Sequence, residues 1–204
     1  GQCVKSIIYL IGATFLIELS LRILYYCMEQ KKDFTLPSSK FTPIISWCKT
    51  KRDGEIAVLE NAKCPVVIRT AWLYSVHGNN FVKTMRRLGA EKDSINVVCD
   101  QIGTPTFAGD LADAIVKIIP QMSKDNAGVY HFTNEGVCSW YDFAIKIMEL
   151  SGLKCDVKPI MSNQYPTRAK RPHFSVLSKN KIKDVFDLDI NHWEKGLEKC
   201  IKQF

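Results

Sequence analysis

The chain has 204 residues, of which 46% are hydrophobic and 24% charged, a composition that excludes a disordered protein and allows one globular domain with its own core. Its net charge of +7 suits an anionic ligand, but no nucleic-acid motif and no row of aromatic residues accompanies the basic residues, so we expect no nucleic-acid binding. Eight scattered cysteines lack the spacing of a metal or redox motif, which predicts free thiols, no bound metal and a cytoplasmic protein.

Residues 1–40 form an atypical apolar segment. The apolar run over residues 7–17 is shorter than the roughly 20 residues that span a membrane. Glu18 and Arg22 follow it at the spacing of a helical ion pair. We therefore predict a buried or interfacial helix and no membrane span, and the lack of a small-residue cleavage site argues against a signal peptide. A degenerate membrane anchor and a mistranslated segment are the alternatives.

From Gly54 onward, predicted helices and strands alternate, which is typical of an α/β fold with a parallel sheet. In chain order, we predict a helix ending near residue 62, a strand over 64–70, a helix over 80–88, a strand over 95–99, a helix over 110–119, a strand over 128–133, a helix over 140–150, and a last helix that carries Trp193.

Helix ends are marked by polar residues and glycines. Ser139 and Asp142 have the spacing of a capping box at the start of the helix over 140–150, and Asn191 and Glu194 repeat the arrangement before the last helix. Gly89 is predicted to be the C-cap of the helix over 80–88.

Several side chains follow the predicted strands, where ligands of open α/β sheets bind. The indole of Trp72 could pack on a sugar or a base there, with burial in the core as the alternative. The turn-rich loop over residues 100–106 could present amide and hydroxyl groups, or be a plain turn. Arg171 lies in a stretch over 165–183 that has six basic residues and no acidic one, and its guanidinium suits a diphosphate. We predict that His131 is a buried histidine of the core.

Seven segments of the chain, in order, resemble the dTDP-4-dehydrorhamnose reductase family of the extended short-chain dehydrogenases. They begin after Gly54-Glu55 and extend over about 125 residues, and their number and order make the resemblance specific. The segments are 67–74 (Val-Ile-Arg-Thr-Ala-Trp-Leu-Tyr), 78–85 (Gly-Asn-Asn-Phe-Val-Lys-Thr-Met), 100–106 (Asp-Gln-Ile-Gly-Thr-Pro-Thr), 110–112, 128–132, 138–144, and 165–172 with 175–177.

The resemblance implies NADPH-dependent reduction of dTDP-4-dehydro-L-rhamnose to dTDP-L-rhamnose, a precursor of cell-surface polysaccharide. It implies a partial Rossmann-like parallel sheet with a C-terminal cap that binds the sugar nucleotide. Lys51 corresponds to the catalytic lysine of a Tyr-x-x-x-Lys motif, which also holds the cofactor ribose. The resemblance assigns the remaining residues to the cofactor (Arg69 and Thr70) and to the dTDP-sugar (Trp72, Asn80, Gln101, Thr106 and Arg171).

The sequence departs from the family pattern in two places. Trp47 stands where the motif has its tyrosine, and an indole N–H does not release a proton at a useful pH. No Gly-rich dinucleotide turn precedes Gly54, so we predict that the N-terminal dinucleotide-binding half is missing and that residues 41–204 are a remnant of the reductase core with its substrate-binding part. We therefore predict that the chain binds a dTDP-sugar and that it has no reductase activity as it stands. A non-catalytic regulatory homologue and a truncated or frame-disrupted product are the alternatives.

Overall fold

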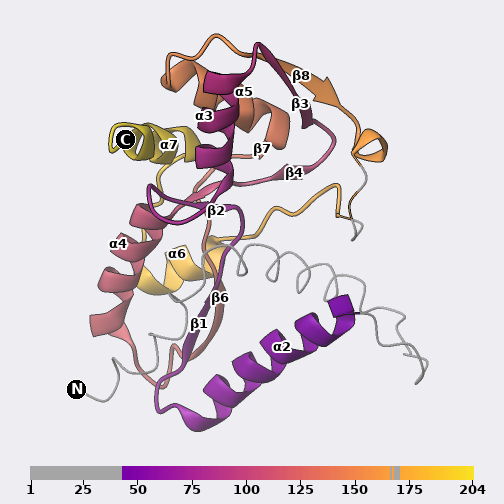
Figure 1. Cartoon of the computed structure of the whole chain (residues 1–204). Coiled ribbons are helices and arrows are strands. Elements are labelled where there is room, and N and C mark those ends of the chain that lie inside the picture. Colours follow the sequence, from indigo (N-terminus) through magenta and orange to yellow (C-terminus); the bar gives the residue numbers. More distant parts are fainter. Residues whose placement is uncertain (1–42, 166, 168–170) are drawn as a thin grey trace.

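A computed structural model of the chain describes residues 43–165, 167 and 171–204, with side chains from residue 51 onward (Figure 1). The predicted helix within residues 1–40 lies outside the described residues, as does the side chain of Trp47. The elements in order are α2 (Pro43–Asn61), β1 (Val66–Arg69), β2 (Leu73–Tyr74), α3 (Phe81–Glu91), β3 (Ser94–Val98), β4 (Ile102–Gly103), β5 (Thr106–Phe107), α4 (Ala108–Ile118), the 3-10 turn η3 (Ile119–Gln121), β6 (Gly128–His131), β7 (Cys138–Ser139), α5 (Trp140–Leu150), β8 (Asp156–Ile160), the 3-10 turn η4 (Ser162–Gln164), α6 (Asn180–Phe186) and α7 (Trp193–Ile201).

The strands pair two by two, and three of the four pairs described are parallel. β1 pairs with β6, β2 with β5 and β3 with β8 in parallel, while β4 and β7 are antiparallel. The registers begin at Val66 opposite Gly128 and at Ser94 opposite Asp156. Each parallel pair joins strands that are separated in the sequence by helices, which confirms the α/β class.

Helices cover both faces of the β1–β6 pair (Figure 1), with α2 on one side and α4 and α6 on the other. Val66 and Ile68 of β1 pack into an apolar cluster with Ile118 of α4 and Ile182 of α6. Because side chains alternate along a strand, Arg69 points to the opposite face, where it meets α2. A second cluster, in the upper part of Figure 1, joins α3, α5 and α7 to β3 and β8.

Two predicted helix caps are wrong. Gly89 lies inside α3, not at its end, and a Cβ added there would sit 2.5 Å from the sulfur of Met148, so the glycine lets α5 pack closely. The last helix is capped by His192, whose side chain accepts from the backbone N–H of Glu194, and not by Asn191. By contrast, α5 begins at the predicted capping box, in which Ser139 and Asp142 exchange hydrogen bonds.

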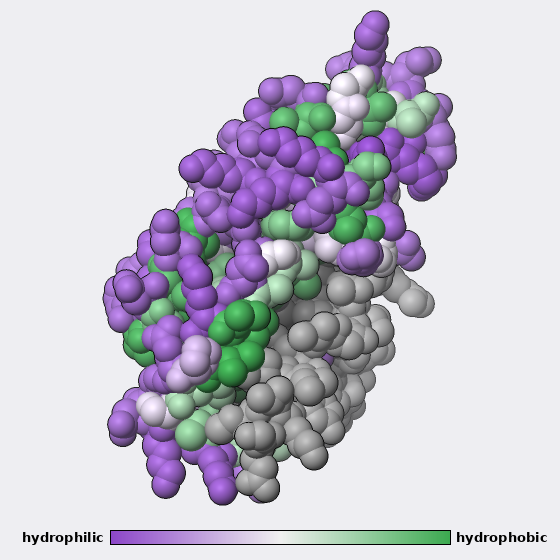
Figure 2. All heavy atoms as spheres, turned by 90° about the vertical axis from the view of Figure 1, so that its left-hand side faces the viewer, coloured by the Kyte–Doolittle hydropathy of each residue, from purple (hydrophilic) through white to green (hydrophobic). Residues whose placement is uncertain are grey.

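The surface on the left side of Figure 1 is mostly hydrophilic, with apolar residues in small separate patches (Figure 2). Isolated apolar residues such as Val116, which is 68% exposed on α4, are normal on a protein surface. Within the described part of the chain, no helix is both long and apolar enough to cross a membrane.

Candidate functional site

Arg69 ends β1 and forms a two-pronged ion pair with Glu55 of α2. Its Nε and Nη2 donate to the two carboxylate oxygens at 2.8 and 2.6 Å, and the two side chains are only 14% and 13% exposed. His131 lies opposite Arg69 in the sheet, and burial lowers its pKa, with the charge of Arg69 adding to the effect. The guanidinium that the resemblance assigns to the cofactor therefore fastens α2 to the sheet.

Trp72 lies in the core, and this corrects the expectation that its indole faces a ligand. The side chain is 2% exposed and stacks on Trp140 with ring centroids 3.5 Å apart and planes 8° apart. A Cβ added at Gly103 would lie 2.5 Å from the indole, so the backbone of β4 also closes on the ring. The φ of Trp72 is +50°, a left-handed conformation that costs a bulky residue energy. Thr70, two residues earlier, is also buried.

Asn80 and Thr106 have partners within the fold. The Asn80 side chain caps α3 by accepting from the N–H of Lys83 at 3.1 Å, and it donates to the carbonyl of Ser75 at 2.6 Å. The Thr106 hydroxyl donates to the carbonyl of Ala71 at 2.6 Å and is fully buried. Both side chains thus have partners within the fold, and their contact with the dTDP-sugar stays a prediction.

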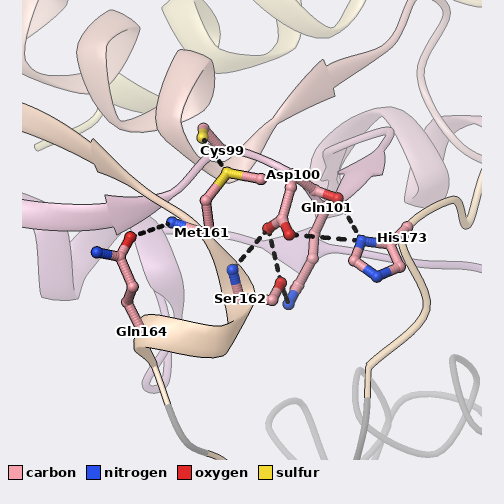
Figure 3. Close-up of polar contacts among 7 residues, drawn as sticks. All are labelled: Cys99, Asp100, Gln101, Met161, Ser162, Gln164 and His173. Carbon is pink, nitrogen blue, oxygen red and sulfur yellow. Dashed lines mark hydrogen bonds and ion pairs between the residues drawn. The ribbon is translucent and has the colours of Figure 1, made fainter.

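A polar cluster gathers at the carboxyl ends of β3 and β8 (Figure 3), centred on the turn that holds Asp100 and Gln101. Asp100 Oδ1 accepts from the backbone N–H of Ser162 at 3.0 Å and from its hydroxyl at 2.6 Å. Gln101 Nε2 donates to the same hydroxyl at 2.8 Å. Nδ1 of His173 lies 3.0 Å from the carbonyl oxygen of Asp100 and 3.5 Å from its carboxylate.

The cluster contains a serine, a histidine and an aspartate, as a hydrolase triad does, but its hydrogen bonds differ from those of a triad. In a triad the histidine stands between serine and aspartate and takes the serine proton. Here Asp100 stands between Ser162 and His173, so the imidazole has no route to the hydroxyl (Figure 3). Partial burial acts to raise the pKa of Asp100, but the hydrogen bonds from Ser162 and the charge of His173 lower it overall, which makes the carboxylate a poor base.

Two buried cysteines are unsuited to act as nucleophiles, and the described part of the chain has no side-chain grouping for a metal ion. Burial raises the pKa of Cys138, and it raises that of Cys200 to about 11, so both are thiols at neutral pH. Among the described residues, no three His, Cys, Asp or Glu side chains are grouped so that they could hold a metal ion.

Among the predicted site residues, Lys51 is exposed, Arg171 and Arg69 are partly buried, and the others are buried. Arg171 is half-buried and lies two residues before His173, whose ring contacts Asp100 in the polar cluster. Lys51 is exposed on α2. The structure therefore places Gln101 in the polar cluster with His173, which follows Arg171 by two residues, and places Lys51 on the separate helix α2. Ser162 and His173 were not predicted from the sequence, because the strand before Ser162 was not predicted and His173 lies unmarked within the basic stretch over 165–183.

Comparison with known proteins decides the family. The model of the RmlD substrate binding domain matches residues 16–204. The chain belongs to this family. The match begins inside the apolar segment over residues 1–40, for which the sequence had predicted no family resemblance.

Relatives of the chain include a spore coat polysaccharide biosynthesis protein and several dTDP-4-dehydrorhamnose reductases. The spore coat polysaccharide biosynthesis protein SpsK of Bacillus subtilis is 39% identical over 155 residues, 76% of this chain and 53% of the relative. The dTDP-4-dehydrorhamnose reductase of Escherichia coli is 34% identical over 176 residues, 82% of this chain and 59% of the relative. The chain thus spans little more than half the length of these relatives.

Solved structures give the same family. The dTDP-4-dehydrorhamnose reductase of Bacillus anthracis, in complex with NADP, has a TM-score of 0.73 at 38% identity and is matched over 82% of this chain and 58% of its own. A reductase of Clostridium acetobutylicum has a TM-score of 0.71 at 39% identity, over 85% of this chain and 61% of its own. These similarities confirm the Rossmann-like α/β fold.

The residues present in this chain do not fit a dinucleotide. No two of its eleven glycines are two positions apart, so a G-x-G-x-x-G turn does not occur in the 204 residues. Arg69 is engaged by Glu55 and Thr70 is buried, which leaves Lys51 as the one residue with a predicted cofactor role that is exposed among those described.

Proposed function

We propose that this chain is the sugar-nucleotide-binding part of a dTDP-4-dehydrorhamnose reductase and that it binds a dTDP-sugar. The observation that carries the proposal is the polar cluster at the carboxyl edge of β3 and β8, in which Asp100 contacts Ser162 and His173, and His173 follows Arg171 by two residues. A guanidinium at this edge can contact a diphosphate with two parallel hydrogen bonds. The family membership supports the same ligand class.

We further propose that the 204-residue chain does not reduce the sugar by itself. Trp47 stands in the position of the proton-donating tyrosine, and its indole cannot supply a proton to a developing alkoxide. The sequence offers no Gly-rich cradle for the pyrophosphate of NADPH. A cytoplasmic location, without a nucleic-acid partner, is part of the same proposal and is supported by the free thiols of the described cysteines.

Calorimetry with dTDP tests the binding proposal. We expect the chain to bind dTDP and Arg171→Ala to weaken binding about tenfold, because a charged hydrogen-bond donor contributes about 1.5–3 kcal/mol. Arg87→Ala is the matched control, since that arginine pairs with Glu91 on the exposed face of α3, and its affinity should be unchanged. Absence of any binding heat would favour the truncated product over a sugar-nucleotide binder.

A turnover assay tests the absence of catalysis. With dTDP-4-dehydro-L-rhamnose and NADPH we expect no NADPH oxidation by the chain, nor by Trp47→Tyr, because restoring the proton donor does not restore a cofactor site. The full-length reductase of Escherichia coli, assayed with the same substrate, is the positive control. NADPH oxidation above background by either form of this chain would overturn the proposal.

A further inference from the structure

His131 and Arg69 lie opposite each other in the parallel register of β6 and β1. Side chains alternate along a strand, and residues in register on neighbouring strands point to the same face. Ile68 and Tyr130, one position earlier on each strand, belong to the apolar cluster on the face that α4 and α6 cover. His131 therefore lies on the other face, where Arg69 meets Glu55 of α2.

The imidazole of His131 is partly buried, and charged side chains of three elements act on it. Among the described residues these are Arg69 of β1, Glu55 of α2 and Lys181 of α6. Glu55 is already engaged, since both of its oxygens accept hydrogen bonds from the Arg69 guanidinium. The ring also has a hydrogen bond with the backbone of Ser178, just before α6. Two cations and one carboxylate thus surround the ring before it takes up a proton.

Burial and charge favour the neutral form of this ring. Burial lowers the pKa of His131, and the charges of Arg69 and Lys181 lower it further. The hydrogen bond with Ser178 and the charge of Glu55 act in the opposite direction and offset part of this effect. The imidazole is therefore uncharged near neutral pH, and the carboxylate of Glu55 is left to Arg69.

We infer that proton uptake by His131 loosens the attachment of α2 to the β1–β6 pair, which makes this contact sensitive to pH. An imidazolium beside Arg69 repels the guanidinium and competes with it for Glu55. The ion pair that is weakened in this way is the one that fastens α2 to the sheet. Lys51 is exposed on the same helix, so its position depends on this contact, whereas dTDP binding plays no part in it.

Amide hydrogen exchange in α2, corrected for the intrinsic exchange rate at each pH, tests the inference. The pKa of His131 is lower in the folded chain than in the unfolded one, so protection is complete above the unfolded pKa and is lost as the pH falls through the folded one. Between about pH 7.5 and about pH 5.5, we expect α2 protection to fall about fivefold more in the unchanged chain than in His131→Gln.

His77→Gln is the matched control, because this histidine is exposed in a loop that follows β2. The pH dependence of α2 protection should be the same in His77→Gln as in the unchanged chain. An equal pH dependence in His131→Gln and the unchanged chain would overturn the inference. So would a loss of the pH dependence in His77→Gln, because the responsible proton would then bind elsewhere.

A nuclear magnetic resonance titration of the unchanged chain keeps the inference testable if His131→Gln does not fold. We expect His131 to titrate at a lower pH than His77 and the backbone signals of α2 to change with the same midpoint as His131. Lys181→Gln removes a neighbouring positive charge, so it should move both of these midpoints upward and leave that of His77 in place. A His131 midpoint at or above that of His77, or α2 signals that do not follow His131, would contradict the inference.

Discussion

Trp140→Ala is expected to lower the free energy of unfolding by about 3–5 kcal/mol, the cost of truncating a buried large aromatic residue. Trp140 is 6% exposed, stacks on Trp72, and lies with its ring centroid 4.6 Å from that of Phe81. The cavity would open where α5 begins, next to Trp72 and Phe81 in the cluster that joins α3, α5 and α7. Urea denaturation followed by far-UV circular dichroism measures the loss.

The control for Trp140→Ala is Val116→Ala, which truncates a side chain that is 68% exposed on α4 and should change stability by less than about 0.5 kcal/mol. The near-ultraviolet circular dichroism of the native protein should also change, since the stacked pair is asymmetric and close. A loss below about 1 kcal/mol for Trp140→Ala would mean that the two indoles are not packed as the structure has them.

Glu55→Gln is expected to destabilise the protein by about 2–4 kcal/mol, because it leaves the largely buried guanidinium of Arg69 without its counter-charge. The effect should reach α2, which this ion pair fastens to β1. Protease digestion under native conditions should therefore cut within α2 more quickly in the variant, and urea denaturation gives the change in stability.

Glu91→Gln provides the comparison, since Glu91 pairs with Arg87 at 2.9 Å on an exposed helix face where the side chains are 52% and 61% exposed. Such a pair contributes about 0.3–0.5 kcal/mol. If Glu55→Gln lowered the free energy of unfolding no more than Glu91→Gln, the ion pair of Arg69 would contribute no more than an exposed pair. Its guanidinium would then be available to a ligand.

The elements that the sequence predicted best are those determined by neighbouring residues. The helix over 140–150 was predicted at its observed bounds because Ser139 and Asp142 define its start and the apolar spacing defines its face. Strand β8 was not predicted, because Lys158 and Pro159 interrupt the apolar pattern and proline argues against a strand. It forms nonetheless because β3 provides a parallel partner along its whole length.

The errors arose where distant parts of the chain decide the local structure. Gly89 looks like a helix end, but its role is to let Met148 of a later helix approach. Asn191 looks like a cap, but its side chain donates to Asp110, and His192 takes the capping position. Both contacts join residues that are far apart in the sequence, so periodicity and capping rules alone cannot reveal them.

The dTDP-sugar contacts of the predicted site residues stay a prediction, and the structure shows only how these side chains are packed. Composition and resemblance pointed to Gln101 and Arg171, and the structure places Gln101 in the polar cluster, where its side chain donates to Ser162. From the sequence alone, an aromatic residue after a strand can either contact a ligand or pack in the core. The stack of Trp72 on Trp140 shows that this indole packs in the core. Ser162 could not be connected to Asp100 without the register that brings β3 and β8 together.

The strand registers have a consequence for how the chain acquires its structure. Val66 pairs with Gly128 and Ser94 with Asp156, so β3 lies in sequence between β1 and β6, while its partner β8 lies beyond them. The two pairings are interleaved, and the two apolar clusters draw on alternating stretches of the chain. No continuous fragment holds one whole cluster without residues of the other, so we expect the two clusters to fold as one cooperative unit through slow, long-range loop closures.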